Sequence, residues 1–593
     1  MKKWAKYAKP YTKYFILGPL CMIVEVIGEI VMPKLYSVIV GHASDHLASG
    51  APGSVWYVVG IAGLMILTAV LMMLGGVGGA YFGAKASVNF ASDLRIDVFR
   101  KVQKFSFANI DKFQTGSLVT RLTNDVTQIQ MIVSMGLQML IKSPIMAVWA
   151  IIKILGKSWE LSAVTAAFVV VICSSVLAIM SVCLPRFRIV QKLTDKINRV
   201  ARENLTGINV VHAFNAEDYQ NEKFDVPSGE MMRTQLKNQR LFSFMQPIML
   251  LGMNGLALVI YWLGAALIDR IPIADSAARL SFFSEVLVFS TYATYVVMSF
   301  MMLVMIFMLL PSAQVSAERI NEVLDRRSTL TEGSTAAGDA PGTVEFRHVS
   351  FRYPNAAADV LHDISFKVEH GGTLAIIGAT GSGKSTLVGL IPRFYDATAG
   401  EVLIDGVNVK DYDFDTLYGK LGYVTQKAVL FAGTVRDNVF FGKSRAAESD
   451  ENLRRALEVS QAAEFVDKLP DGADHKIAQL GRNVSGGQKQ RLSIARALAR
   501  DPELLVFDDS FSALDYRTDA TLRGALAEQM CDATKIIVAQ RIGTIRHADQ
   551  IIVLDHGRAV GIGTHKELMQ TCTVYQEIAR SQLSAEELER EVG

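Results

Sequence analysis

Six long apolar segments occupy the first half of this 593-residue chain, and charged positions collect in the second half. A helix needs roughly 20 residues to cross a hydrocarbon layer of about 30 Å, and each segment is long enough to do so. The pattern predicts six membrane helices, with approximate spans 14–40, 54–84, 134–156, 161–184, 243–269 and 282–311. Because neighbouring helices can satisfy the backbone groups that proline frees, we expect kinks rather than breaks. The prolines concerned are Pro33, Pro144, Pro247 and Pro311.

The basic residues between the spans predict the side of the membrane on which each connection lies. They are abundant before residue 14 and in the segments 86–133 and 185–242, and scarce in 41–53 and 157–160. Both termini are therefore expected in the cytoplasm. The two long basic segments are too polar for lipid and too regularly patterned for disorder, so we expect them to extend the membrane helices as stalks. The first apolar run is too long for a signal-peptide core and should remain as an anchor.

Three acidic residues lie within the predicted spans. Glu25 and Glu29 are one helical turn apart on the same face of the first span, and Glu285 lies near the start of the sixth. Charges inside a membrane are costly and face a cavity or a partner. Two interpretations stay open: these acids face a substrate cavity, or they lie at headgroup depth or pair with basic residues of another helix.

The sixth span also presents a polarizable surface that could repack around varied apolar ligands. Ordinary helix packing explains the same side chains equally well. They are Tyr292, Tyr295, Met298, Phe300, Met301, Met302, Met305 and Met308.

The second half has the pattern of an α/β domain. A Ser/Thr/Ala/Gly-rich stretch over 327–342 predicts a flexible linker between a domain at 1–326 and a domain at 343–593. Alternating polar and apolar positions predict strands at 343–346 and 349–353. Continuous apolar runs predict buried strands at 373–377, 504–508 and 535–539.

A glycine-rich segment, here called the phosphate loop, directly follows the strand expected at 373–377. It comprises Gly378, Ala379, Thr380, Gly381, Ser382, Gly383, Lys384, Ser385 and Thr386. Between a strand and a helix, such glycines let successive backbone N–H groups face phosphate oxygens. Lys384 is suited to neutralise the β and γ phosphates, and Ser385 to coordinate Mg²⁺. The loop predicts ATP and Mg²⁺ as cofactors.

Net charge and cysteine spacing further limit the partners and sites that we expect for this chain. The net charge is only +2 and no basic module is evident, which argues against a nucleic-acid partner. The cysteines show neither paired spacing nor a metal-ligand cluster, and we interpret them as packing residues. They are Cys21, Cys173, Cys183, Cys531 and Cys572.

A second glycine-containing helix start lies farther along the chain. This signature segment, formed by Ser485, Gly486, Gly487 and Gln488, opens a helical run that continues to Leu498. Its N–H groups at the positive end of a helix dipole are suited to bind phosphate. Because the phosphate loop occupies a different helix start, two anion sites on one domain suggest that each completes a site on another domain.

Together these motifs resemble the ABC transporter family, and nearly the whole chain resembles an exporter-type half-transporter. The resemblance implies an all-α six-helix transmembrane domain with long cytoplasmic extensions, followed by an α/β P-loop ABC ATPase domain. The segments 110–118, 121–125 and 202–207 resemble the cytoplasmic loops by which ABC exporters touch their ATPase domains. The resemblance also implies that two ATPase domains sandwich two ATP molecules, each between one chain's phosphate loop and the other's signature segment.

The resemblance assigns roles to further residues. Tyr353 matches the aromatic ring that stacks on adenine, although a strand tyrosine can equally serve packing. Gln426 matches the glutamine that reaches the Mg²⁺ region, and Asp508 matches the carboxylate that holds Mg²⁺. Asp515, after Ser512-Ala513-Leu514, matches the D-loop aspartate.

The chain departs from the family pattern at two catalytic positions. Asp509 stands where the family has a glutamate that positions or deprotonates water, and Gln540 where it has a histidine. The shorter carboxylate is drawn back by on the order of 1 Å, which can cost about 10²-fold in rate. Glutamine cannot carry a proton or a positive charge. The segment 478–483 also lacks the acidic residue usual in homodimeric exporters and is similar to the heterodimeric form.

These observations lead us to expect one half of a heterodimeric ABC exporter in a bacterial-type inner membrane. It would export amphipathic drugs, lipids or peptides, and its own ATP site would be degenerate, while its signature segment would complete the competent site of a second half-transporter. Three alternatives remain: an exporter-fold importer, for example of a metal chelate; an ATP-gated regulator or channel subunit; and a homodimer with weak sites.

Overall fold

The computed structural model describes residues 4–49, 55–155, 157–273, 275–335, 338, 340–354, 356–443 and 445–583, except the side chains of 43–45, 47–49, 307 and 308. The side chain of Met308 and the residues of the linker at 336, 337 and 339 therefore lie outside the described part. The chain forms two compact units. One contains Met1–Lys101 with Gly116–Asp325, and the other contains Val102–Thr115 with Arg326–Gly593.

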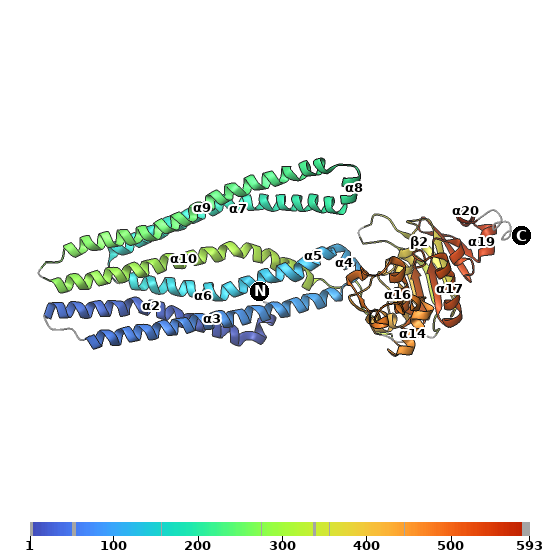
Figure 1. Cartoon of the computed structure of the whole chain (residues 1–593), viewed down its shortest axis with the longest axis horizontal. Coiled ribbons are helices and arrows are strands. Elements are labelled where there is room, and N and C mark those ends of the chain that lie inside the picture. The colour runs from blue at the N-terminus through green and yellow to red at the C-terminus, as the bar shows by residue number, and fades with distance from the viewer. Residues whose placement is uncertain are drawn as a thin grey trace. The chain divides into compact units, whose positions relative to one another are not determined.

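In its described residues, the first unit consists of helices joined by short connections, without strands (Figure 1). Six helices are long and apolar enough to cross a membrane, as the sequence predicts. They contain α2 (Thr12–Ser49), α3 (Val55–Gln103), α6 (Val126–Leu155), α7 (Trp159–Thr206), α9 (Glu217–Asp269) and α10 (Ser276–Asp325). Shorter elements are α1 (Ala5–Ala8), a 3-10 turn (Lys9–Tyr11), α5 (Thr115–Thr120), a π-helix (Arg121–Asp125) and α8 (Ile208–Ala213).

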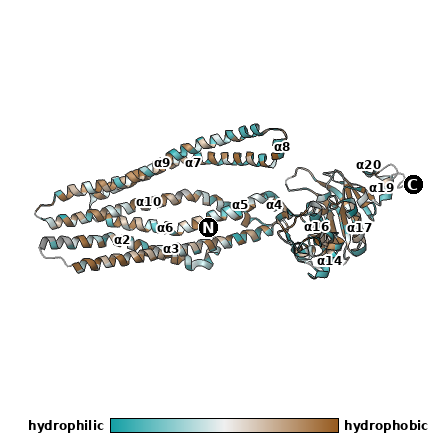
Figure 2. Cartoon of the chain, viewed as in Figure 1, coloured by the Kyte–Doolittle hydropathy of each residue, from teal (hydrophilic) through white to brown (hydrophobic). Residues whose placement is uncertain are grey.

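The long helices continue well past the spans that hydrophobicity alone predicts. Figure 2 shows α7 and α9 becoming hydrophilic toward α8, which joins them. The expected stalks are therefore continuous extensions of membrane helices. Prolines inside α2, α6, α9 and α10 do not break them, as expected. A buried apolar cluster from α2, α6, α7, α9 and α10 forms the core of this unit.

An ion triad inside the first unit decides between the two interpretations of Glu25 and Glu29. The Lys142 ammonium on α6 donates to Glu25 Oε1 at 2.7 Å and to Glu29 Oε1 at 2.8 Å, both on α2. The three side chains are only 14–20% exposed. The acids therefore pair with a basic residue of another helix. Glu285 likewise pairs with Lys157, at 2.6 Å and in a more exposed position.

We expect Lys142→Ala to destabilise the helical unit by roughly 3–5 kcal/mol, because it leaves two largely buried carboxylates without their counter-ion. Thermal unfolding of the purified protein in detergent measures the effect. Lys6→Ala is the matched control, since it breaks the exposed pair with Asp97, which is worth about 0–1 kcal/mol. Similar shifts for both variants would contradict a structural role for the triad.

The second unit contains two main sheets and a small hairpin. An antiparallel sheet has the order β2-β1-β4-β5, from β1 (Val344–Phe351), β2 (Leu361–Val368), β4 (Ala399–Ile404) and β5 (Val407–Asn408). The larger sheet has the order β12-β11-β3-β10-β9-β6, parallel except for β12. Its strands are β3 (Thr373–Gly378), β6 (Leu421–Val424), β9 (Leu504–Asp508), β10 (Thr534–Val538), β11 (Gln550–Asp555) and β12 (Arg558–Gly563). The hairpin joins β7 (Gly433–Thr434) and β8 (Lys476–Ile477).

Helices cover these sheets and bury two apolar cores, one on each side of the larger sheet's strands. They are α11 (Lys384–Gly389), α12 (Phe414–Gly419), α13 (Val435–Val439), α14 (Asp450–Val459), α15 (Ala463–Val466), α16 (Gly486–Leu498), α17 (Tyr516–Gln529), α18 (Ile542–Ile545), α19 (His565–Thr571) and α20 (Thr573–Gln582). Short 3-10 turns lie at Gly472–Asp474 and Gln479–Gly481.

Two local predictions need correction. The strands expected at 343–346 and 349–353 are one strand, β1, whose pairing with β2 shifts register between Phe346 and Val349. His348 has φ +51° at this bulge, which breaks the alternation that suggested two strands. The stretch expected as a flexible linker is held in its described part by backbone hydrogen bonds: Thr335 N–H donates to Asp411 O, and Ala340 N–H to Asp405 O.

The second unit also includes α4 (Phe107–Phe113), which lies in the first long polar connection between the predicted spans. The Phe107 ring lies 4.5 Å from that of Phe394, and the Tyr395 hydroxyl donates to Asp111 Oδ2 at 2.7 Å. Burial and this carboxylate raise the pKa of Tyr395. The loop predicted to touch the ATPase domain thus packs into that unit.

Candidate functional site

Four neighbouring strands of the larger sheet place the candidate residues at one edge. β3, β10, β9 and β6 are parallel, so their carboxyl ends lie together. The phosphate loop begins at the end of β3, and Gln540 follows β10. Asp508 ends β9, Asp509 directly follows it, and Gln426 follows β6. Ligands of open α/β sheets bind at this edge.

The phosphate loop is built around positions that require glycine. Gly381 and Gly383 have φ +84° and +101°, and a Cβ on Gly378 would lie 2.1 Å from Leu554 O. Lys384 Nζ donates to the carbonyls of Gly378 and Ala379 at 2.9 and 2.8 Å, so its ammonium is held over the loop. Burial lowers the pKa of Lys384, which Asp509 and Asp508 partly oppose.

Ser385 and Asp508 form an oxygen pair suited to Mg²⁺. Ser385 Oγ donates to Asp508 Oδ1 at 2.8 Å, and Asp508 is 7% exposed. The pKa of Asp508 is raised above its ordinary value, mainly by burial. The hydrogen bond from the Ser385 hydroxyl partly opposes this increase in the pKa. A divalent cation would favour the charged carboxylate, and hydroxyl and carboxylate oxygens are ligands that Mg²⁺ prefers.

Asp509 and Gln540, the two residues that depart from the family pattern, form a hydrogen bond with each other. Gln540 Nε2 donates to Asp509 Oδ2 at 2.7 Å, and Gln426 Nε2 donates to the same oxygen at 3.1 Å. Asp509 is 6% exposed and has φ +48°, and its N–H is directed to Val538 O. One carboxylate oxygen is thus occupied by two neutral amides, a contact that sequence spacing alone cannot reveal.

The signature segment forms the start of α16. Ser485 is its N-cap: Ser485 Oγ accepts from the N–H of Gln488, whose side chain accepts from the N–H of Ser485. A Cβ on Gly486 would meet nothing within 4 Å, so the helix start is open. In the described part of the chain, no hydrogen bond joins this segment to the phosphate loop.

Tyr353 and Asp515 have structural contacts as well as expected roles. The Tyr353 hydroxyl lies 3.1 Å from Thr386 Oγ1, and its ring meets those of Phe351 and Tyr395 edge-on. The half-buried tyrosine therefore borders the phosphate loop while also packing. Asp515 is the N-cap of α17, accepting from the N–H of Thr518 at 2.9 Å, and this contact lowers the pKa of Asp515.

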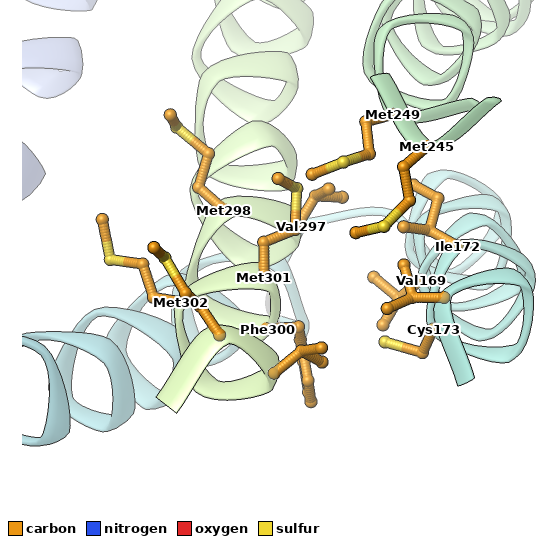
Figure 3. A pocket seen from close by; sticks show the side chains of 13 residues that line it. Val169, Ile172, Cys173, Met245, Met249, Val297, Met298, Phe300, Met301 and Met302 are labelled. Carbon is orange, nitrogen blue, oxygen red and sulfur yellow. The ribbon is translucent and has the colours of Figure 1, made fainter. Parts of the chain in front are cut away.

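In the first unit, a cavity of about 310 Å³ lies between α7, α9 and α10. Met298, Met301 and Met302 of α10 line it, and Figure 3 shows Met301 on the side of α10 toward Met245 and Met249. The sequence pattern did not indicate the opposite walls, which include Met245 and Met249 of α9. Their i,i+4 spacing was a usable signal, but nothing in the sequence pairs α9 with α10.

Comparison with known proteins identifies the family. The model for the ABC transporter transmembrane region matches residues 15–300, and the ABC transporter model matches residues 361–512. An uncharacterized ABC transporter ATP-binding protein of Mycobacterium tuberculosis is 37% identical over 589 residues, which cover 97% of each chain. This chain belongs to the ABC transporter family. It carries the transmembrane and ATPase domains of an exporter-type ABC transporter fused in one polypeptide, and its ATPase domain implies ATP binding.

Two further similarities bear on this ABC transporter. The ATP-dependent lipid A-core flippase of Aromatoleum aromaticum is 31% identical, with 95% of this chain and 93% of that protein covered. A bacterial Atm1-family ABC exporter, solved with ATP bound, is 24% identical, with a TM-score of 0.76 over 95% of this chain and 98% of its own. The latter likeness supports the fold of the ABC transporter.

Proposed function

We propose that this chain is one half of a heterodimeric exporter that moves amphipathic small molecules, lipids or peptides out across a bacterial inner membrane. Both termini and the ATPase domain lie in the cytoplasm. The flippase relatives support an amphipathic substrate, and the cavity lined by methionines supports an apolar, adaptable contact with it.

The observation that carries the proposal is the contact between Asp509 and Gln540. A hydrolytic site needs a carboxylate that reaches the attacking water and a residue that contacts the γ-phosphate. In this chain, the Asp509 side chain is one methylene shorter than glutamate. Its Oδ2 accepts hydrogen bonds from the side-chain amides of Gln540 and Gln426. The site keeps the parts that bind ATP and loses the parts that position water.

In this proposal, the residues divide into three roles. The phosphate loop and Tyr353 hold the nucleotide, and Ser385, Gln426 and Asp508 surround Mg²⁺, which neutralises phosphate charge when bound. The signature segment serves the phosphate loop of the partner, and Asp515 is the D-loop aspartate. Because Ser485 and Gln488 cap α16 reciprocally, the open start of that helix is already ordered to meet an anion.

ATP binding draws the two ATPase domains together, and the long helices transmit this closure to the membrane. Hydrolysis at the partner's site resets the transporter. The degenerate site keeps the domains in contact between cycles.

Inside-out vesicles containing both half-transporters test the direction of transport. We expect ATP-dependent accumulation of a fluorescent amphiphile inside the vesicles, and no accumulation when Lys384→Ala is combined with the matching change in the partner. ATP-dependent loss of a preloaded solute would instead indicate an importer, and ion conductance without accumulation would indicate a channel subunit.

A further inference from the structure

A second cavity in the helical unit is chemically unlike the methionine-lined one. It measures about 310 Å³ and lies among α2, α6 and α10. Four of its lining residues carry a formal charge: Lys34, Lys153, Lys157 and Glu285. With three ammonium groups and one carboxylate, the cavity has a formal charge of +2.

The single carboxylate is already engaged. Lys157 Nζ donates to Glu285 Oε1 at 2.6 Å, so that pair is neutral. Among the described side chains, neither Lys34 nor Lys153 forms an ion pair. These two lysines come from different helices, yet both line the same small volume. Two positive charges near apolar spans, with no counter-ion among the side chains that the structure describes, favour an anion as their partner.

The remaining wall of this cavity is apolar. Val288 and Phe289 of α10 line it, and Phe289 is buried within the core. Tyr292 also lines it, but its hydroxyl donates to Ile30 O at 2.8 Å, which leaves mainly the ring for a ligand. A cationic rim beside an apolar wall fits a molecule with an anionic head and a hydrocarbon tail.

We expect the lysines of this cavity to lie at the depth of the lipid headgroups in the membrane. Lys34 and Lys153 lie near the ends of the spans predicted at 14–40 and 134–156, close to the connection 157–160 expected outside. Lysine side chains at such depths direct their ammonium groups to the interface. We propose that this cavity binds the phosphate headgroup of an anionic lipid, through Lys34 and Lys153, with the acyl chain along Val288 and Phe289.

The site is independent of the heterodimer, since all of its residues belong to this chain. Binding of phosphatidylglycerol to the purified full chain in neutral detergent, counted by native mass spectrometry, tests it. We expect one retained lipid, and about 30-fold weaker binding in Lys34→Gln/Lys153→Gln, because each lysine near a membrane contributes on the order of a fivefold factor. Arg270→Gln is the control, since it removes one positive charge on the same expected side without lining the cavity.

A second variant changes affinity in the opposite direction. Glu285→Gln keeps all three lysines and frees Lys157, so we expect severalfold tighter binding of phosphatidylglycerol. This readout remains if the double lysine variant fails to fold. Unchanged binding in both variants, or equal retention of phosphatidylcholine, would overturn the proposal. Displacement of the lipid by millimolar inorganic phosphate would assign the site to a free anion instead of a lipid.

Discussion

In the assembled pair, Ser485→Ala in this chain is expected to remove most of the ATPase turnover, whereas Asp509→Ala is expected to remove little. In the proposed function, the serine belongs to the helix start that completes the partner's competent site. Asp509 belongs to this chain's own site, where two amides already bind an oxygen of its carboxylate. Steady-state phosphate release from the purified pair measures both effects.

The serine substitution also removes a helix cap, which costs about 1 kcal/mol in stability. Thr564→Ala separates the two effects, because Thr564 and Glu567 form the same capping box at the start of α19. We expect Thr564→Ala to lower the unfolding temperature about as much as Ser485→Ala and to leave turnover near that of the parent. Equal loss of turnover from Ser485→Ala and Asp509→Ala would contradict the asymmetry between the sites.

Restoring both family residues should create a working site. Under the proposed function, two copies of this chain alone would still supply intact signature segments, so slow hydrolysis would be due to Asp509 and Gln540. We expect Asp509→Glu/Gln540→His to raise phosphate release by about 10²-fold, the penalty estimated for a carboxylate displaced by on the order of 1 Å. The measurement is turnover at saturating Mg-ATP.

The two substitutions should not act independently, because the side chains they replace are in direct contact at 2.7 Å. Either single variant is therefore expected to gain much less than the double variant. If the double variant stays as slow as the parent, the two departures do not explain the weak site.

Sequence patterns predicted the local features of this protein well. The six membrane helices follow from hydrophobic length, and β3, β9 and β10 follow from short apolar runs beside the phosphate loop. These signals lie within a few consecutive residues. The match to the ABC transporter family confirms the fold and the family that the motifs indicated.

Contacts between distant segments could not be predicted in the same way. Lys142 pairs with Glu25 across 117 residues, and only the packing of α2 against α6 brings them together. The contact between Gln540 and Asp509 depends on β10 lying beside β9, which the sequence does not specify. The strand prediction was wrong here because the bulge at His348 interrupts the alternation of polar and apolar positions without ending the strand.

The ATPase rate of this unaltered chain, purified without any second half-transporter, tests most directly whether its own nucleotide site is degenerate. We expect tight ATP binding with slow phosphate release, and a large rise in release when a half-transporter bearing glutamate and histidine at the matching positions is added. Rapid release by the chain alone would show that Asp509 and Gln540 support hydrolysis and that no partner is required.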